Sequence, residues 1–410
     1  MEFSRDPEAL GRPPSGRAAL CMIVFTDMVG IGLIIPVMPD LLAELGALDL
    51  GSAAAIGGWL VFAYTAAQLV AAPLLGWLSD RVGRKQVIVV ALVGLMLDYL
   101  VMYFAASLLV LFIGRIVAGA CGATFPIATA YMADISRPEN RTANFGLIEA
   151  AAGIGLIAGP AIGGAASMLD ARAPFLVAAL LIGMNIACVL VFLEGRPAET
   201  PTGAGRDAET PLRLRPLLAV GSVFLLAELA IQALPATWAY FVMLAFGWSA
   251  VDTGLSIAAY GICSAIAQIF ILPFAAKRIG NKATVAAGLA AGAGAFALLA
   301  IASQPWAVAV GLAVGAAGTI AFPALKAMAS REAPDEAQGR VQGLLAGATS
   351  LAILAGSVAM TQVFAAFTPA DRTIFFPGAP FVLASIVFIV ALLLLLFGAG
   401  QSMSKPGRSR

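Results

Sequence analysis

Six ionisable side chains lie inside long apolar stretches of this sequence, namely Asp27, Asp98, Arg115, Glu149, Glu228 and Lys326. A charge within hydrocarbon costs at least ~2.5–3.5 kcal/mol, so each of the six is a candidate functional group. A carboxylate that is removed from water favours its protonated form, and such a group can bind and release a proton near neutral pH. For Asp27 and Glu228, proton or cation coupling is therefore the favoured interpretation, and a structural hydrogen bond is the alternative.

The other four charges have simpler alternatives. Asp98 and Arg115 lie well inside their apolar stretches, where they would either handle protons or neutralise each other as a structural pair. Glu149 and Lys326 lie nearer the ends of theirs. A long side chain there can reach the interface, so snorkelling or pairing is favoured over a substrate contact.

Glu228 precedes Gln232 by four residues, which places both side chains on one face of a helix. Pro235, three residues further on, can free backbone groups that would face a cavity. The sequence therefore predicts that Glu228 and Gln232 bind substrate, together with Asp27 from the first apolar stretch.

A short basic loop, GWLSDRVGRK at 76–85, carries one carboxylate among its cations. Gly83 allows a tight turn, and Asp80 can bond helix-end N–H groups and neighbouring guanidiniums. We predict a conformational latch made of Gly76, Asp80, Arg81, Gly83 and Arg84, with a simple topology anchor as the alternative. The second-half loop KRIGNK at 277–282 lacks the acid, so a latch there would be weaker.

The stretch GIGLIAGPAIGG at 153–164 is rich in small residues. It fails as a dinucleotide-binding motif because no strand precedes it. Small residues four apart let helices approach closely, and a proline kinks the backbone. Close packing is the simpler interpretation, and a hinge or seal between two halves of the protein is the functional one. The residues concerned are Gly155, Gly159, Pro160, Gly163 and Gly164.

These side chains need membrane-spanning helices to hold them. The chain has 410 residues, of which 61% are hydrophobic and 11% charged, against roughly 25% charged in soluble domains. About 20 apolar residues cross a ~30 Å hydrocarbon core. The apolar stretches predict an all-α membrane protein with twelve spans at 18–42, 54–79, 86–105, 108–133, 142–167, 173–194, 217–245, 250–276, 283–302, 305–330, 340–366 and 376–399.

The polar segment 195–216 divides the spans into two sets of six. The predicted organisation is an N-terminal tail (1–17), a six-helix bundle (18–194), a linker (195–216), a second bundle (217–400) and a C-terminal tail (401–410). Twenty of the 24 Lys and Arg residues fall in the tails and in the loops of one side, whereas Arg172 and Arg372 lie on the other side. Because positive loops stay in the cytoplasm, both termini are predicted to be cytoplasmic.

The halves resemble each other at a constant offset of 197 residues, from Phe125-Pro126 to Phe322-Pro323 and from Arg81-x-Gly83 to Arg278-x-Gly280. This offset predicts a six-plus-six duplication. Parallel halves of this kind enclose a site near the membrane midplane and expose it alternately to the two sides.

Several classes of function are excluded. The net charge of +1 gives no support to nucleic-acid binding, and a chain with no histidine lacks an imidazole base and histidine metal ligands. Cys21, Cys121, Cys188 and Cys263 are dispersed in apolar stretches, which favours thiols buried in lipid-facing or packed helices over a disulfide or metal role. No reactive cluster indicates an enzyme, no ATP-binding motif is present, and we expect no metal or cofactor.

The motifs together resemble the major facilitator superfamily, and within it the tetracycline-resistance-type drug/proton antiporters. The residues that carry the resemblance are DMVGIGLIIPVMPDLL (27–42), GWLSDRVGRK (76–85), LDYLVM (97–102), IGRIVAGACGAT (113–124), ADISRPENRTANFG (133–146), GIGLIAGPAIGG (153–164), ALPATWAYF (233–241), FGWSAVDTGLS (246–256), FPALKAMAS (322–330) and QGRVQGLLAGATSL (338–351).

The resemblance implies roles for particular residues. Asp27 and Asp98 match the family's carboxylates in spans 1 and 3, Arg115 its proton-handling arginine, and Gln68 a polar residue of the span 2 substrate pathway. The glycine-proline run is similar to the antiporter motif, which favours efflux. Ser264 and Gly292 stand where tetracycline/metal antiporters have a histidine and an aspartate. This difference makes tetracycline a doubtful substrate and suggests that coupling has moved to Glu228.

The prediction is a twelve-helix inner-membrane transporter that exports a drug or other amphipathic molecule in exchange for protons. Its expected partners are a small-molecule substrate, protons and membrane lipids, without nucleic acid, and it is expected to be monomeric. The alternatives are a symporter or lipid flippase of the same fold and, outside transport, a membrane sensor.

Overall fold

The computed structural model describes residues 14–193, 214–334, 337–369 and 375–398, and within these ranges the chain is helical with no strand. The predicted all-α class is confirmed. The N-terminal tail up to residue 13, most of the predicted linker and the C-terminal tail lie outside the described residues.

The helices follow one another with short connections. A 3₁₀ turn, η2 (Pro138–Asn140), precedes α7, and a π-helical turn, η3 (Ala267–Ile271), joins α11 to α12. The α-helices are α1 (Pro14–Ile34), α2 (Met38–Gly46), α3 (Leu50–Val82), α4 (Arg84–Phe104), α5 (Leu108–Cys121), α6 (Thr124–Ile135), α7 (Arg141–Ser167), α8 (Ala173–Phe192), α9 (Leu214–Ile231), α10 (Ala233–Phe246), α11 (Ala250–Ile266), α12 (Leu272–Ala300), α13 (Pro305–Gly318), α14 (Ala321–Arg331), α15 (Gln338–Ala366) and α16 (Ala379–Gly398).

Eleven helical stretches among the described residues are long and apolar enough to cross a membrane. One of them, Ala250–Ala300, has 51 residues, and a straight helix of that length would measure roughly 77 Å, more than twice the hydrocarbon core. The backbone turns sharply at Gly280, whose φ is 78°. The predicted spans 250–276 and 283–302 both fall in this stretch, on either side of that glycine.

Four predicted spans are broken in the middle or near one end, and the breaks recur at every third span. The first span separates into α1 and α2, the fourth into α5 and α6, the seventh into α9 and α10, and the tenth into α13 and α14. Such breaks occur in membranes only where neighbouring groups satisfy the freed backbone. The recurrence indicates that each half consists of two related three-span units.

Equivalent geometry in the two basic loops supports the duplication. Gly83 has a φ of 112° and Gly280 a φ of 78°, a region that disfavours other residues. The Arg81 guanidinium lies 4.1 Å from the centre of the Trp77 ring, and that of Arg278 lies 4.6 Å from the Phe274 ring. Trp77 and Phe274 are themselves separated by the offset of 197 residues.

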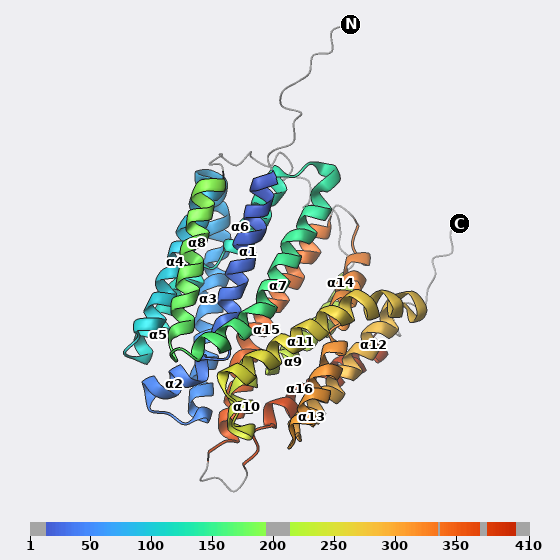
Figure 1. Cartoon of the computed structure of the whole chain (residues 1–410). Coiled ribbons are helices and arrows are strands. Elements are labelled where there is room, and N and C mark those ends of the chain that lie inside the picture. The colour runs from blue at the N-terminus through green and yellow to red at the C-terminus, as the bar shows by residue number, and fades with distance from the viewer. Residues whose placement is uncertain (1–13, 194–213, 335–336, 370–374, 399–410) are drawn as a thin grey trace, which may run out of the picture.

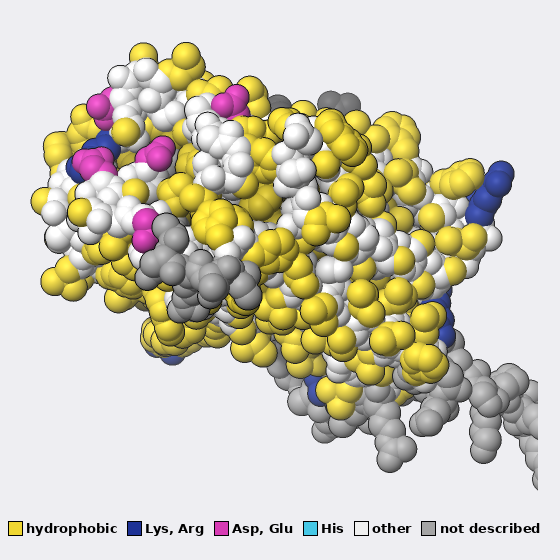
Figure 2. Space-filling view, turned by 90° about the horizontal axis from the view of Figure 1, so that it is seen from below, with side chains coloured by type: hydrophobic (Ala, Val, Ile, Leu, Met, Phe, Trp, Pro, Cys, Tyr) yellow, Lys and Arg dark blue, Asp and Glu magenta, His cyan; other side chains and the backbone are white. Residues whose placement is uncertain are grey.

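The two ends of the molecule differ in charge. We call the end that carries the 76–85 and 277–282 loops the basic side, and the opposite end the acidic side. Figure 2 looks onto the acidic side, where carboxylates gather over one half and apolar side chains cover most of the remaining surface. On the acidic side, Arg172 forms an ion pair of 2.9 Å with Glu44 at the end of α2.

The halves are in contact at the acidic side. There α3 packs on α15, and α7 packs on α11. A Cβ added to Gly58 would collide with Thr361, one added to Gly254 would collide with the Pro160 carbonyl group, and Gln362 donates a hydrogen bond of 3.3 Å to the Ala55 carbonyl oxygen.

Toward the basic side the halves separate. A Cβ added to Gly76, Gly146, Gly153, Gly343 or Gly347 would meet no atom within 4 Å. Figure 1 shows α11 beginning beside α7 at the lower, acidic end and running away from it. Among the described residues, the halves therefore lie apart at the basic side.

Candidate functional site

The space between the halves holds two adjoining cavities. The first, about 310 Å³, lies against the first half and is lined by Tyr64, Gln68, Tyr99 and Arg115, among others. We call it the N-half cavity. The second, about 730 Å³, is the C-half cavity. Its lining includes Glu228, Tyr260, Gln268 and Lys326, and four residues, Ile31, Ile35, Pro235 and Ile353, line both cavities.

Asp98 and Arg115 form a direct ion pair in the N-half cavity wall. Arg115 Nη2 contacts Asp98 Oδ2, and Arg115 Nε donates a hydrogen bond of 3.4 Å to Asp98 Oδ1. The guanidinium also lies 5.3 Å from the centre of the Tyr64 ring. Asp98 is buried on α4, and only Arg115, on α5, faces the cavity. The two alternatives for these residues are proton handling and mutual neutralisation. The structure has the two side chains in contact, as the second alternative requires.

Gln68 lies on α3 in the wall of the N-half cavity, and its amide is already engaged. Gln68 Nε2 donates a hydrogen bond of 2.5 Å to the Gly122 carbonyl oxygen, which is located where α5 ends and α6 begins. This bond satisfies one of the backbone groups that the break frees. The amide oxygen remains the polar group of Gln68 that a ligand can contact.

Asp27 lies behind the wall of the N-half cavity. It is 4% exposed and lines neither cavity. Its carboxylate is close enough to act electrostatically on the hydroxyl groups of Tyr64 and Tyr99, which both line the cavity. Asp27 Oδ1 is buried without a hydrogen-bond partner among the described residues. Its position therefore suits a proton site better than a direct substrate contact.

Glu228 and Lys326 face the C-half cavity from α9 and α14. Thr349 donates a hydrogen bond to the Glu228 carboxylate, and the Lys326 charge acts on that carboxylate electrostatically. Within the described part of the chain, neither takes part in a direct ion pair. The helix break separates Gln232 from this wall, because Gln232 packs against Gly356 of α15 and lines neither cavity. Glu149 is exposed on α7 and lines neither cavity.

The two positions that depart from the tetracycline/metal pattern have different environments. Ser264 lines the C-half cavity near Tyr260. Gly292 lies in the packed contact of α12 with α13 and α16, where an added Cβ would come within 3.2 Å of the Phe388 ring. An acidic side chain at residue 292 would require Phe388 to move.

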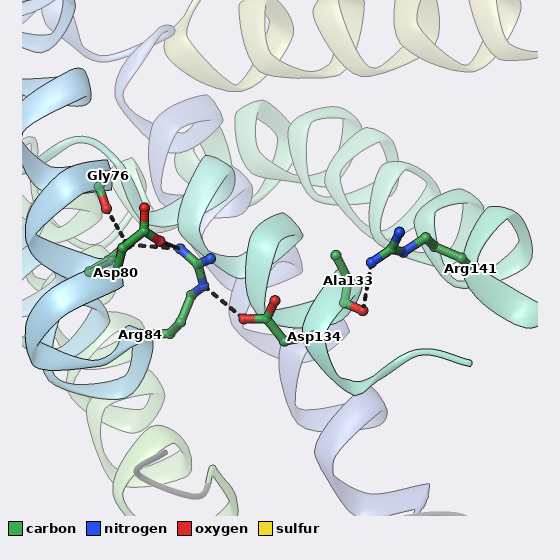
Figure 3. Close-up of polar contacts among 7 residues, drawn as sticks. Gly76, Asp80, Arg84, Ala133, Asp134 and Arg141 are labelled. Atoms are coloured by element: carbon green, nitrogen blue, oxygen red, sulfur yellow. Dashed lines mark hydrogen bonds and ion pairs between the residues drawn. The ribbon is translucent and has the colours of Figure 1, made fainter. Parts of the chain in front are cut away.

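The predicted latch residues make their contacts within the first half. Arg84 on α4 bridges Asp80 of α3, at 2.7 Å, and Asp134 of α6, at 2.9 Å. Figure 3 shows Arg84 lying between these two carboxylates, and Arg141 of α7 pointing to the Ala133 carbonyl oxygen. Ser79 Oγ donates to the Gly76 carbonyl oxygen at 2.7 Å and accepts from Arg84. In this conformation the cluster links α3, α4 and α6, which all belong to the first half.

The small residues of α7 have two partners. Gly155, Gly159 and Gly163 face α1, where an added Cβ on Gly159 would lie 2.6 Å from the Val29 carbonyl oxygen. Gly164 faces α11 of the other half, and an added Cβ there would lie 2.7 Å from the Ala250 carbonyl oxygen. The Pro160 carbonyl group also faces α11, at Gly254. The motif therefore packs one half internally and also forms part of the seam between the halves.

Sequence reasoning missed four polar residues of this region, Tyr260, Gln268, Thr319 and Thr349. Gln268 lies in the π-helical turn, and its Nε2 approaches Thr319 Oγ1 at 3.5 Å, at the break between α13 and α14. Thr319 is separated from Gly122 by the offset of 197 residues. The repeat could have identified Thr319 as the counterpart of the first-half break.

Comparison with known proteins agrees with this geometry. The chain matches the Major Facilitator Superfamily over residues 20–236 and 220–409. The chain belongs to this superfamily. It is 41% identical to the class C tetracycline resistance protein of Escherichia coli over 361 residues, which cover 85% of this chain and 90% of that protein. It is 36% identical to the class G protein of Vibrio anguillarum over 383 residues, covering 90% and 94%.

A more distant relative is the quinolone resistance protein NorA of Staphylococcus aureus, 27% identical over 347 residues, which cover 83% of this chain and 88% of NorA. A bacterial homologue of the lysosomal transporter Spinster shares the fold with a TM-score of 0.83 at 14% identity, covering 97% of this chain and all of that chain. These comparisons confirm the predicted class of protein, a drug transporter of this superfamily rather than an enzyme.

Proposed function

We propose that this protein exports an amphipathic drug-like molecule from the cytoplasm in exchange for protons. The observation that carries the proposal is the pair of cavities between the halves, on the side where the described parts of the halves separate. Glu228 lies in the wall of one cavity, and Asp27 is buried behind the wall of the other. A ligand site between two halves that separate on one side is the arrangement that alternating access requires.

The positive-inside rule gives the direction of loading. Lys and Arg residues gather in the loops of the basic side, which would therefore face the cytoplasm, with both termini on the same side. The cavity then loads from the cytoplasm of a bacterial inner membrane. The seam at the acidic side would open toward the exterior in the alternate state.

Asp27 is the proposed proton site of the first half. It is buried behind two tyrosines of the cavity wall and has an unpartnered carboxylate oxygen among the described residues. Glu228 is the proposed second titrating group, since it faces the cavity in the half that lacks the family's histidine. A proton that enters from outside would neutralise one carboxylate and favour return to the open state seen here.

The relatives suggest the class of cargo. Tetracycline and quinolone resistance proteins are similar to this chain over most of its length. Ser264 and Gly292 depart from the tetracycline/metal pattern, so we propose an aromatic drug other than the metal chelate as the preferred cargo.

Transport by the purified monomeric protein in liposomes tests the proposal. We expect an imposed pH gradient to drive uptake of norfloxacin into the compartment opposite the basic side. Asp27→Asn should abolish the pH-driven component and leave binding intact. Glu149→Gln is the matched control, because this exposed carboxylate lines neither cavity.

Two outcomes would overturn the proposal. Flux that ignores the pH gradient would remove proton coupling, and normal coupled flux in folded Asp27→Asn would remove Asp27 as its site. Movement of the drug with the proton, or of a fluorescent lipid in its place, would favour the symporter or the flippase.

A further inference from the structure

The C-half cavity contains two opposite charges that do not neutralise each other. Glu228 reaches it from α9 and Lys326 from α14. They act on each other electrostatically, yet no direct ion pair joins them. In the N-half cavity wall, by contrast, Arg115 contacts Asp98 directly.

Glu228 is held in place at the cavity wall. The carboxylate is partly buried, and Thr349 of α15 donates a hydrogen bond to it. Lys326 is exposed to the open space on the same side. The cavity wall therefore holds a carboxylate that is fixed by a hydrogen bond and an exposed ammonium group, and Gln268 and Thr319 add polar groups to it.

The remaining walls suit an aromatic body. Trp238, Tyr260 and Phe322 line the cavity together with Ile and Leu side chains. Its volume of about 730 Å³ lies within the roughly 300–1,000 Å³ of sites that enclose drug-sized ligands. Rings of this kind also attract a ligand cation that lies against their faces.

We propose that the C-half cavity selects zwitterionic aromatic amphiphiles, with the ligand's ammonium group at Glu228, its carboxylate at Lys326 and its ring system between the aromatic walls. This inference rests on the proposed function, since it names the substrate class of the same cavity. A ligand with one charge leaves either Glu228 or Lys326 without a partner. A zwitterion satisfies both.

A series of four probes that share one ring system tests the proposal. At neutral pH norfloxacin carries an ammonium and a carboxylate, its methyl ester only the ammonium, its N-acetyl derivative only the carboxylate, and the N-acetyl methyl ester no charge. Each is titrated into the purified full-length protein in detergent, without a pH gradient, and Kd is measured from tryptophan fluorescence.

In the unmodified protein, norfloxacin should bind at least about tenfold more tightly than either singly charged probe, because charge-assisted contacts are lost one at a time. In Lys326→Gln, norfloxacin and its methyl ester should bind within about threefold of each other. In Glu228→Gln, norfloxacin should match the N-acetyl derivative. The uncharged probe should bind all three proteins alike, which also reports folding.

Lys277→Gln and Glu149→Gln are matched controls, because they remove one exposed charge of each sign away from the cavities. Equal binding of the four probes by the unmodified protein would overturn the proposal, as would an absence of binding. The same holds if the preference survives in both cavity variants. The comparison within the unmodified protein needs no substitution, so a poorly folded variant cannot leave the question open.

Binding and transport separate the two proposals. Selective binding without pH-driven flux would leave this inference standing and overturn the proposed export. Coupled export of all four probes without selectivity would do the reverse.

Discussion

The two halves share a plan of broken helices and basic loops, yet they treat their intramembrane charges in opposite ways. In the first half Asp98 and Arg115 are in direct contact in the wall, and Asp27 lies behind it. In the second half Glu228 and Lys326 face the cavity without a direct pair. Two opposite charges in direct contact add little net charge to a cavity wall. Two opposite charges that are not in contact can each interact with a charged group of a ligand.

The two pairs do not occupy equivalent positions of the repeat, since the offset of 197 residues places Ala295 and Leu312 opposite Asp98 and Arg115. The difference suggests a different role for each pair. A buried pair that is broken leaves an uncompensated charge, so the first-half pair supports the fold. The second-half charges line the C-half cavity, and in our proposal they bind the cargo. The four predictions below test this division, from the largest expected effect to the smallest.

Removal of one member of each pair should separate the two roles. Arg115→Gln leaves the Asp98 carboxylate buried without its partner, which should lower the free energy of unfolding by about 3–5 kcal/mol. Lys326→Gln should change it by less than ~0.5 kcal/mol, because Lys326 is exposed. Thermal and denaturant unfolding in detergent measure both, and Asp98→Asn/Arg115→Gln should recover most of the loss. Equal losses in the two single variants would erase the distinction between the pairs.

Two glycines of α7 compare a contact within one half with a contact between halves. Gly159→Leu would force Leu against the Val29 carbonyl of α1, and such overpacking should cost about 1–3 kcal/mol of stability. Gly164→Leu faces α11 across the seam, where the halves can move apart. We expect it to retain stability, lose transport and open the acidic side, as measured by distances between spin labels on α7 and α11. Full transport by Gly164→Leu would show that the seam tolerates a bulky side chain.

The hydrogen bonds that the glutamines beside two helix breaks donate should differ in their contribution to stability. Gln68 donates at 2.5 Å to the Gly122 carbonyl oxygen, whereas Gln268 lies 3.5 Å from Thr319 Oγ1. Gln68→Ala should therefore cost roughly 1 kcal/mol of stability and Gln268→Ala only a few tenths. Unfolding curves of both variants and of Gln362→Ala, a glutamine at the seam, provide the comparison. A larger loss for Gln268→Ala would reverse the predicted order.

A substitution in the basic loop of the first half should have the smallest effect on stability. Asp80 is 45% exposed in its side chain and contacts Arg84, so Asp80→Asn should lower stability by less than about 1 kcal/mol. If Asp80 also closes the basic side in the alternate state, the variant should shift spin-label distances between the 76–85 and 277–282 loops toward opening. Lys277→Asn is the control in the loop that has no acid. Unchanged distances would reduce the predicted latch to a topology anchor.

The sequence by itself determined the membrane class, the approximate positions of the apolar spans and the family. Apolar stretches of about 20 residues leave few alternatives, because backbone groups in hydrocarbon must be bonded within a helix. The constant offset of 197 residues also predicted the duplication, and the structure adds that both basic loops turn at a glycine of positive φ. These properties depend on the hydropathy of short segments and on repeated motifs, and both can be read from the sequence without knowledge of the fold.

The tertiary structure alone decided where helices break and which side chains face the cavity. Hydropathy averages over a whole span, so it could not locate the break at Gln232, which turns this residue toward Gly356 while Glu228 stays in the cavity wall. Nor could it show that Lys326 and Glu228 line the same cavity, since their helices, α14 and α9, come into contact only after folding. Whether two intramembrane charges form a direct ion pair or stay apart depends on distances between helices, and those are set by packing across the whole bundle.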